Sequence, residues 1–342
     1  MTSAIQTKRH EGRDEPILDP DLPIIDAHHH LFDLPNNRYM ADDFLADVKA
    51  GHRILASIYC ETQAFSRKEG PEWMRPIGEV EFANGVGAMT AAGVYGPCQV
   101  CAGIVGHANL TFGSKVGELL DRCLEAAPDR FRGVRHVTID YPDDRPFKYV
   151  MTYKPPAGVM ETENFPLGLA EVEKRGLTFD AGIFDPSLPK LAAMVDRFPG
   201  LTFVLDHMGI AVGVDMNAEE KVEVFHRWGA GLRELARRPN VFCKIGGLGM
   251  PSWGFGFELR EAPIGCLELA EAWRPYVETA IEAFGPDRCM MESNFPPDGR
   301  SGGYVPVWNA YKHILRAHSA DEKATLFHRT AARVYRLSVP GL

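Results

Sequence analysis

Three consecutive histidines near the start of the chain, in the run Asp26-Ala27-His28-His29-His30, are the first candidates for chemistry. They follow the apolar residues 22–25, a pattern typical of a short buried strand. Because side chains alternate along a strand, we expect Asp26, His28 and His30 to point the same way. Neutral imidazole binds divalent metal ions, and two histidines spaced two apart can share one ion. The run therefore predicts half of a metal or acid–base site.

Two later apolar runs end in residues that could complete this site. The run 202–207 ends in His207, and the run 289–293 is followed directly by Asn294. Glu292 and Asn294 share a parity in the second run, so Glu292 is expected one layer deeper than Asn294. We take His28, His30, His207, Glu292 and Asn294 as the catalytic candidates.

A second group of polar residues lies inside other apolar runs and suggests substrate binding. Arg135 and His136 are adjacent, so only one of them can enter the site; an arginine there could bind a carboxylate or instead pair with a helix. Lys244 interrupts an apolar run and needs a partner or a function. Tyr59 and Glu61 share a parity and are expected at the same rim.

The elements that must position these residues alternate regularly along the chain. Strand-like apolar runs are separated by amphipathic, helix-like segments, which favours a parallel sheet with crossover helices. There are eight runs, at 24–28, 54–61, 99–106, 133–139, 177–184, 202–207, 241–245 and 289–293. Eight strands close a (β/α)8 TIM barrel, whose active site lies at the carboxyl ends of its strands.

The main alternative fold is an open doubly wound sheet, which shows the same alternation. The chain has no glycine-rich phosphate-binding turn after its first predicted strand, and histidines stand there instead. We therefore predict an α/β protein with one TIM-barrel domain at 22–342, preceded by a flexible N-terminal arm at 1–21.

Three long connections are expected to open onto the catalytic face, at 62–83, 141–166 and 246–266. Long irregular segments in a compact domain are often binding loops, although surface decoration is the alternative. The aromatic residues from 246 to 273 could also serve a homo-oligomer interface. The loops would determine which small molecule binds.

Composition narrows the partners and the compartment. The formal charge is −9 and there is no long basic block, which disfavours nucleic acid and anionic membranes as partners. Seven cysteines lie mostly in apolar segments, as expected for reduced cysteine in the cytoplasm. The N-terminal segment is too polar for a secretory signal, and no run is long enough to span a membrane. We predict a cytoplasmic protein that binds a small-molecule substrate.

Six motifs together identify a family. They are Asp-x-His-x-His at 26–30, Gly-Val-Arg-His at 133–136, Leu-Asp-His-Met-Gly at 205–209, Cys-Lys-Ile-Gly-Gly at 243–247, Glu-Ser-Asn-Phe-Pro at 292–296, and the tail at 326–337. Over residues 22–338 the chain resembles the amidohydrolase superfamily, within it the amidohydrolase-2 group of 2-pyrone-4,6-dicarboxylate lactonase and L-fuconolactonase. The resemblance implies a (β/α)8 barrel that hydrolyses a lactone or similar ester at its C-terminal rim.

The resemblance also assigns residues and exposes two departures. It makes His28 and His30 the first-strand pair, His207 the sixth-strand histidine, and Arg135 a binder of substrate carboxylate. Those relatives end the eighth strand with an aspartate that acts as base or metal ligand, where this chain has Asn294. An amide cannot take a proton from water and is a poor metal ligand. Either Glu292, our first choice, or another carboxylate supplies the base, or the usual mechanism does not operate.

The second departure lies in the fifth strand, which has no histidine; Asp180 is the nearest substitute. Two cofactor states stay open: a divalent metal held by His28, His30 and His207, with zinc the first choice, or metal-independent action. In either state the histidines would stabilise charge that develops on oxygen.

Three functions follow from these observations. The first is hydrolysis of a lactone or related cyclic ester of a carboxylated or sugar-like molecule, with water attacking at the barrel rim. The second is metal-dependent decarboxylation of an aromatic or unsaturated acid, an activity that the superfamily also contains. The third is small-molecule binding without catalysis, for which Asn294 is the reason.

Overall fold

Eight parallel strands form the centre of the protein, whose computed structural model describes residues 12–35, 37–149 and 154–342. Each strand pairs with the next one along the chain. They are β1 (Ile24–His29), β4 (Ile54–Cys60), β5 (Gln99–His107), β6 (Phe131–Arg135), β7 (Thr178–Ala181), β8 (Thr202–Leu205), β9 (Val241–Ile245) and β10 (Cys289–Met291). Just beyond β10 the chain returns to β1: the Asn294 amide donates to the His28 carbonyl oxygen at 2.9 Å, and the His30 amide to the Phe295 carbonyl oxygen at 2.8 Å. These bonds nearly close the barrel.

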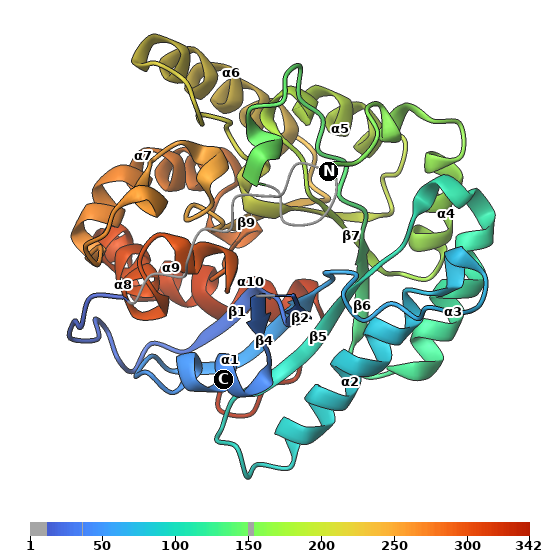
Figure 1. Ribbon diagram of the computed structural model, residues 1–342, viewed down its shortest axis with the longest axis horizontal. Coiled ribbons are helices and arrows are strands. Elements are labelled where there is room, and N and C mark those ends of the chain that lie inside the picture. The colour runs from blue at the N-terminus through green and yellow to red at the C-terminus, as the bar shows by residue number, and fades with distance from the viewer. Residues whose placement is uncertain (1–11, 36, 150–153) are drawn as a thin grey trace.

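The helices surround the strands (Figure 1). They are α1 (Ala41–Val48), α2 (Ile77–Ala91), α3 (Val116–Ala126), α4 (Phe165–Lys174), α5 (Leu188–Val195), α6 (Ala218–Ala236), α7 (Cys266–Phe284), α8 (Tyr304–Ile314), α9 (Ala320–Ala324) and α10 (Thr330–Val334). The arrangement confirms the predicted TIM barrel. A short hairpin of β2 (Phe32–Leu34) and β3 (Asn37–Tyr39) was not predicted.

Two strands, β6 and β7, end three or more residues before their predicted apolar runs do. The run 133–139 continues past the end of β6, and the run 177–184 continues past the end of β7. The apolar residues beyond these ends, such as Val137 and Ile183, line a pocket above the barrel. The first part of each run is apolar because it packs in the barrel, and the last part is apolar because it lines the pocket. The sequence pattern alone does not show where one part ends and the other begins.

Alternation along the strands fills the barrel interior with apolar side chains. The inner group includes Ile25, Ala27, Ile58, Val105, Val204 and Met290. Val334 of α10 and the adjacent Tyr335 pack against the same group. Polar residues begin where this layer ends, so the interior forms an apolar support beneath the site.

Part of the predicted N-terminal arm is bound to the barrel. The Leu18 amide donates to Asn309 Oδ1 at 2.9 Å, and Lys312 Nζ donates to the Leu18 carbonyl oxygen at 2.8 Å. The predicted arm thus contacts the barrel within residues 12–21, and its flexibility stays a prediction; residues 1–11 lie outside the described residues. Residues 150–153 of the predicted loop 141–166 also lie outside them. No described helix is long and apolar enough to cross a membrane.

Candidate active site

The histidines of β1 do not follow simple alternation. The register of β1 against β4 shifts between Asp26 and His29, and Ala27, the neighbour of Asp26, belongs to the inner group. Asp26 accepts hydrogen bonds from the amide and hydroxyl of Ser293, at 2.8 and 2.6 Å. The expectation that Asp26 points with His28 and His30 is therefore wrong, because the irregular register breaks the two-residue period between them.

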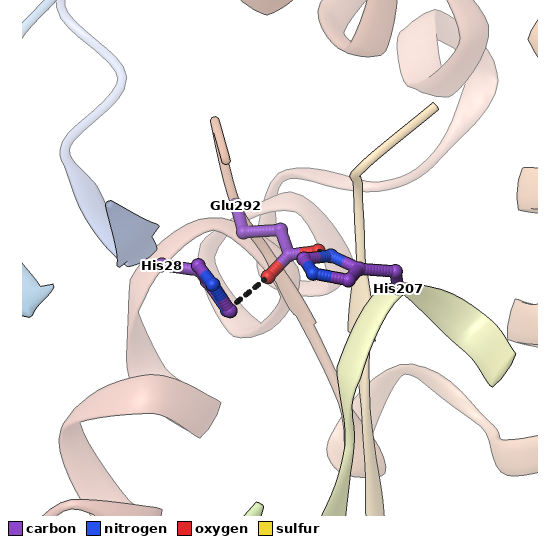
Figure 2. Close-up of side chains that lie close together, drawn as sticks. All are labelled: His28, His207 and Glu292. Atoms are coloured by element: carbon purple, nitrogen blue, oxygen red, sulfur yellow. Dashed lines mark hydrogen bonds and ion pairs between the residues drawn. The ribbon is translucent and has the colours of Figure 1, made fainter. Parts of the chain in front are cut away.

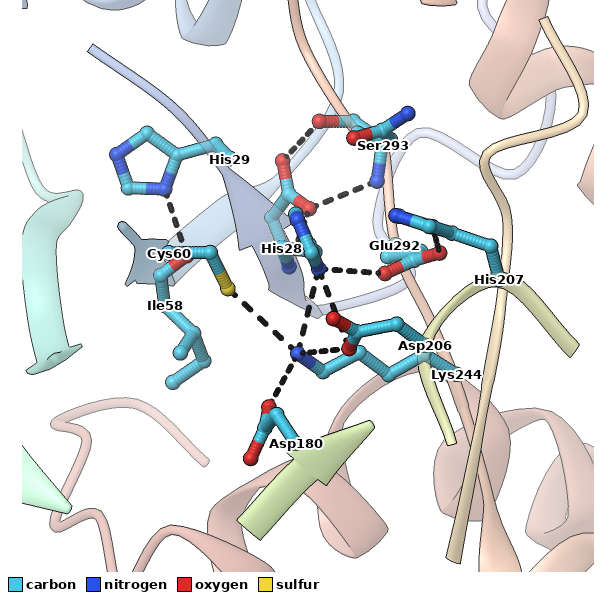
Figure 3. A network of polar contacts seen from close by, with 12 residues as sticks. His28, His29, Ile58, Cys60, Asp180, Asp206, His207, Lys244, Glu292 and Ser293 are labelled. Atoms are coloured by element: carbon cyan, nitrogen blue, oxygen red, sulfur yellow. Dashed lines mark hydrogen bonds and ion pairs between the residues drawn. The ribbon is translucent and has the colours of Figure 1, made fainter. Parts of the chain in front are cut away.

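His29 lies on the other side of β1. Its ring stacks on Phe44 of α1 at 4.1 Å, and its Nδ1 lies 2.9 Å from the Ile58 carbonyl oxygen. Figure 3 shows this ring turned away from His28. The middle histidine of the run is thus a packing residue of the barrel wall.

His30 presents an unprotonated nitrogen at the edge of the site. Its Nδ1 lies 2.9 Å from the Cys60 carbonyl oxygen, which can only accept, so the neutral ring carries its proton on Nδ1. Its Nε2 lies 3.0 Å from His28 Nε2. Burial, then His28 and Arg135, hold the pKa of His30 well below its ordinary value. The ring is therefore neutral, and Nε2 is an acceptor.

Glu292 joins His28 to His207. Its Oε1 lies 2.5 Å from His207 Nδ1, and its Oε2 lies 3.2 Å from His28 Nδ1 (Figure 2). Burial alone would raise the pKa of Glu292, but His207 and His28 outweigh it and lower the pKa to about 2. Burial would also lower the pKa of His207, but Glu292 outweighs it and raises that pKa. Glu292 is therefore ionised.

The local backbone brings these side chains together. His207 has a φ of 53°, in a tight turn that directly follows β8, so Asp206 and His207 both reach the site. Gly247, with a φ of 67°, lies so close to this turn that an added Cβ would come within 2.5 Å of His207 Nδ1. Only glycine fits here without moving His207.

Lys244 is the centre of a buried ionic network beneath the histidines (Figure 3). Its Nζ lies 2.7 Å from Asp180 Oδ2, 3.0 Å from Asp206 Oδ1 and 3.3 Å from His28 Nδ1. The Tyr335 hydroxyl donates to Asp180 Oδ2 at 2.6 Å. Burial alone would lower the pKa of Lys244, but Asp180 and Asp206 outweigh it and hold the pKa well above its ordinary value. The lysine is therefore charged and fixes the two carboxylates below His28.

Of the adjacent residues Arg135 and His136, Arg135 is the one that enters the site. Its guanidinium already forms hydrogen bonds and ion pairs with other residues of the site. It donates to Glu61 Oε1 at 2.9 Å and to the Glu61 carbonyl oxygen at 2.7 Å. It also lies 3.3 Å from Asp206 Oδ2 and 3.2 Å from His28 Nε2. These contacts make Arg135 part of the framework that holds His28.

Asn294 lies at the rim with an unsatisfied oxygen. Its Nδ2 donates to Asp298 Oδ1 at 2.7 Å, whereas its buried Oδ1 has no hydrogen-bond partner among the residues that the structure describes. Asn294 lines the pocket and Glu292 does not, in agreement with the expected layers. Burial raises the pKa of Asp298 to about 7. The amide oxygen of Asn294 is thus free to accept a hydrogen bond from a ligand or from water.

An open pocket lies above these residues. Strand ends supply its polar floor: His30, Glu61, Arg135, His207 and Asn294. Each predicted long loop contributes to the wall, with Thr62, Tyr149 and Met250 as examples. The three loops therefore enclose the space above the site.

Two sequence candidates lie elsewhere. The Tyr59 hydroxyl donates to Glu79 Oε1 at 2.9 Å, away from the pocket. His136 accepts from the Leu110 amide and packs against Phe165. Neither lines the pocket. The shared parity of Tyr59 and Glu61 did not bring them together, because β4 ends at Cys60 and Glu61 lies beyond its regular alternation.

Two residues of the site were missed by the sequence interpretation. Asp206 lies two residues after Val204, whose side chain packs in the barrel interior. Strand alternation could therefore have placed the Asp206 side chain on the same inner side. Arg300 lines the pocket from a short 3₁₀ helix, Pro297–Arg300, and no strand pattern marks it.

Three buried side chains could hold a metal ion. The candidate ligand atoms of His28, His207 and Glu292 all lie within 4.8 Å of one another. This set differs from the predicted trio, since Glu292 takes the place of His30. Two histidines and a glutamate form one of the usual ligand sets of catalytic zinc.

The charge of the surrounding network also suits a cation. The network holds four buried carboxylates and two buried cations, and protonated His207 adds a third positive charge, so the net charge is −2 with neutral His207 and −1 with protonated His207. The carboxylates are Glu61, Asp180, Asp206 and Glu292, and the cations are Arg135 and Lys244. Buried charge is stable only when compensated, so a divalent ion would balance the network.

The barrel and this site define a member of the amidohydrolases, and the chain matches that family over residues 25–337. The protein belongs to this family, and the family together with its lactonase-named relatives supports an enzyme, a hydrolase. It is 31% identical to an uncharacterized protein, y4mH, of Sinorhizobium fredii, over 93% of this chain and 99% of that one. It is 29% identical to an L-fucono-1,5-lactonase of Burkholderia multivorans, over 93% and 97% of the two chains.

A solved structure shares the fold over most of its length. A Burkholderia multivorans amidohydrolase, crystallised with zinc bound, superposes with a TM-score of 0.70 at 24% identity, covering 92% of this chain and 99% of that one. The likeness agrees with the barrel described above.

Proposed function

We propose that the protein opens a lactone or related cyclic ester of a small organic molecule. The observation that carries the proposal is the buried group of His28, His207 and Glu292 beneath an open pocket whose floor includes His207. The similarity to an L-fucono-1,5-lactonase over nearly the whole chain supports the choice of reaction.

We assign His28, His207 and Glu292 to holding a divalent ion, with zinc the first choice. Burial, then the nearby charge of Lys244, lowers the pKa of His28, so its ring is neutral as a metal ligand must be. The zinc in the Burkholderia multivorans structure and the charge of the network support the same choice. When bound, such an ion acts as a Lewis acid and lowers the pKa of a water molecule.

The attacking water needs acceptors that face the pocket. Asn294 offers an amide oxygen that lacks a partner among the described residues, and His30 lines the same pocket with an unprotonated Nε2 that lies 3.0 Å from His28 Nε2. We assign both to orienting water. The water oxygen then adds to the ring carbonyl carbon, the ring C–O bond breaks, and the leaving oxygen takes a proton to give a hydroxy acid.

Glu292 receives a different role from the one expected on sequence. A carboxylate with a pKa of about 2 is a weak base at neutral pH, and Glu292 does not line the pocket. We therefore assign it to the ion and to His207 rather than to proton removal from water.

The test is a panel of five- and six-membered lactones offered to the zinc-loaded protein in a weakly buffered solution. Ring opening releases a proton, whereas the decarboxylase alternative releases carbon dioxide from an aromatic acid. We expect proton release in the wild type and about a 100-fold loss or more in Glu292→Gln. The matched control is Glu278→Gln, an exposed glutamate on α7, which should retain full turnover. Carbon dioxide release without ring opening, or no turnover of any lactone, would contradict the proposal.

A further inference from the structure

The wall of the pocket differs in character from its floor. Above the polar strand ends, the wall is mainly apolar, and its residues are Phe32, Leu34, Val137, Ile139, Ile183, Phe184, Ile210, Met250, Pro251 and Pro297. Thr62, Tyr149 and Ser252 are the uncharged polar side chains in this wall. Such a surface favours a ligand with an apolar body.

One cation interrupts this apolar wall. Arg300 lines the pocket and is only 8% exposed. Within the described part of the chain its guanidinium has no hydrogen bond or ion pair in the structure. Burial lowers the pKa of Arg300, and the nearby acids Glu258 and Asp298 only partly offset this effect. Neither acid forms an ion pair with the guanidinium. Asp298 instead accepts hydrogen bonds from Asn294 and from the Gly249 amide.

Other cations near the pocket are already compensated. Arg135 is held by Glu61 and Asp206. Lys148, next to the pocket residue Tyr149, pairs with Asp215 at 2.7 Å. Arg300 is thus distinguished by a buried charge that lacks a counter-ion among the described residues.

A buried guanidinium without a partner is unfavourable unless a ligand supplies the opposite charge. A carboxylate matches it best, because its two oxygens can accept parallel hydrogen bonds from one guanidinium. A polyhydroxylated ring would fit poorly here, since the apolar wall leaves most of its hydroxyl groups without partners.

We propose that the substrate is a lactone with an apolar or aromatic body that carries a carboxylate bound by Arg300. The proposal rests on the proposed lactone hydrolysis and names its substrate class. It moves carboxylate recognition from Arg135, where the sequence placed it, to Arg300. It also predicts that this enzyme discriminates against the sugar lactone for which its Burkholderia multivorans relative is named.

The test compares two probes of nearly equal shape, 3-phenylpropanoate and its neutral amide, by titration calorimetry. We expect the wild type to bind the carboxylate about tenfold more tightly or better. Arg300→Gln should lose this preference, and Arg300→Lys should keep part of it. Arg145→Gln is the matched control, because Arg145 is already paired with Asp143 and Glu220; it should bind as the wild type does.

Equal binding of both probes by the wild type would overturn the proposal without any variant. A carboxylate could also reach a bound ion, so an undiminished preference in Arg300→Gln would overturn it as well. Two lactones separate the failure of lactone hydrolysis from the failure of the Arg300 site. Phthalide-3-acetate is an aromatic lactone with a carboxylate, and D-glucono-1,5-lactone is a sugar lactone without one. If the probes are discriminated but neither lactone is opened, lactone hydrolysis fails and the Arg300 site stands. If only the sugar lactone is opened, hydrolysis stands and the Arg300 site fails.

Discussion

The floor and the wall of the pocket are built in opposite ways. At the floor, ionisable side chains from seven strands or strand ends contact one another. Lys244 by itself contacts three of them, since its Nζ lies within 3.3 Å of Asp180, Asp206 and His28. In the wall, loop residues are mainly apolar, and Arg300 is a cation without a counter-ion among the described residues.

This difference separates reaction from recognition. A network in which each charge fixes its neighbours holds reacting groups in one geometry, which hydrolysis requires. An apolar wall with one uncompensated charge leaves its partner to be supplied by the ligand. Changes at the floor should therefore affect folding and turnover together, whereas changes in the wall should affect mainly substrate affinity.

The largest effect is expected from Lys244→Met. It leaves Asp180 and Asp206 buried without their main counter-charge, so the free energy of unfolding should fall by about 3–5 kcal/mol. Turnover should fall about 1000-fold because His28 loses the network below it. Urea unfolding and lactone assays measure the two effects.

Lys312→Met is the control for this change. Lys312 is a second buried lysine, which donates to the carbonyl oxygens of Leu18 and Asp19 and does not line the pocket. It should lower stability but keep turnover per folded molecule. If Lys244→Met behaved in the same way, the network would have no part in positioning the site.

A smaller effect is expected from Gly247→Ala. The new methyl group must displace His207, which should reduce turnover about 100-fold and destabilise the fold by about 1–3 kcal/mol. Gly256 has a φ of 75° and open space around its Cβ position, so Gly256→Ala adds backbone strain without that collision. Similar turnover in the two variants would show that His207 tolerates movement.

In the wall, Met250→Ala should affect recognition alone. Met250 is partly buried and lines the pocket, so its truncation removes apolar contact with the ligand. We expect KM for an aromatic lactone to rise about 3- to 10-fold with kcat nearly unchanged. Steady-state kinetics would reveal a fall in kcat instead if the wall also positioned the reacting groups.

The smallest effect concerns Glu79, a buried acid outside both regions. Burial, then Glu61, raises its pKa from 4.5 to about 6. The folded state therefore binds this proton more tightly than the unfolded state, and stability should fall as the pH rises from 4.5 through 6. Glu79→Gln should make stability less dependent on pH in this window, as urea unfolding at pH 4.5, 6 and 7 would show. An unchanged pH dependence would rule out Glu79 as its source.

The sequence predicted the barrel because its eight apolar runs alternate with helical segments. It also identified Lys244, a charged residue inside such a run, and Glu292, a charged residue near the end of another, as site candidates. It misplaced Asp26, because alternation holds only for regular strands and the register of β1 shifts there. It did not identify Arg300, which reaches the pocket through the folding of a loop, and no periodic pattern encodes that contact.

The most direct test of the account is the metal content of the purified wild-type protein and of the Glu292→Gln variant, measured by inductively coupled plasma mass spectrometry. We predict about one divalent ion per chain in the wild type and a large loss in the variant. Chelation should abolish lactone opening, and zinc should restore it. Full lactone turnover by a protein free of metal would contradict the assignment of His28, His207 and Glu292.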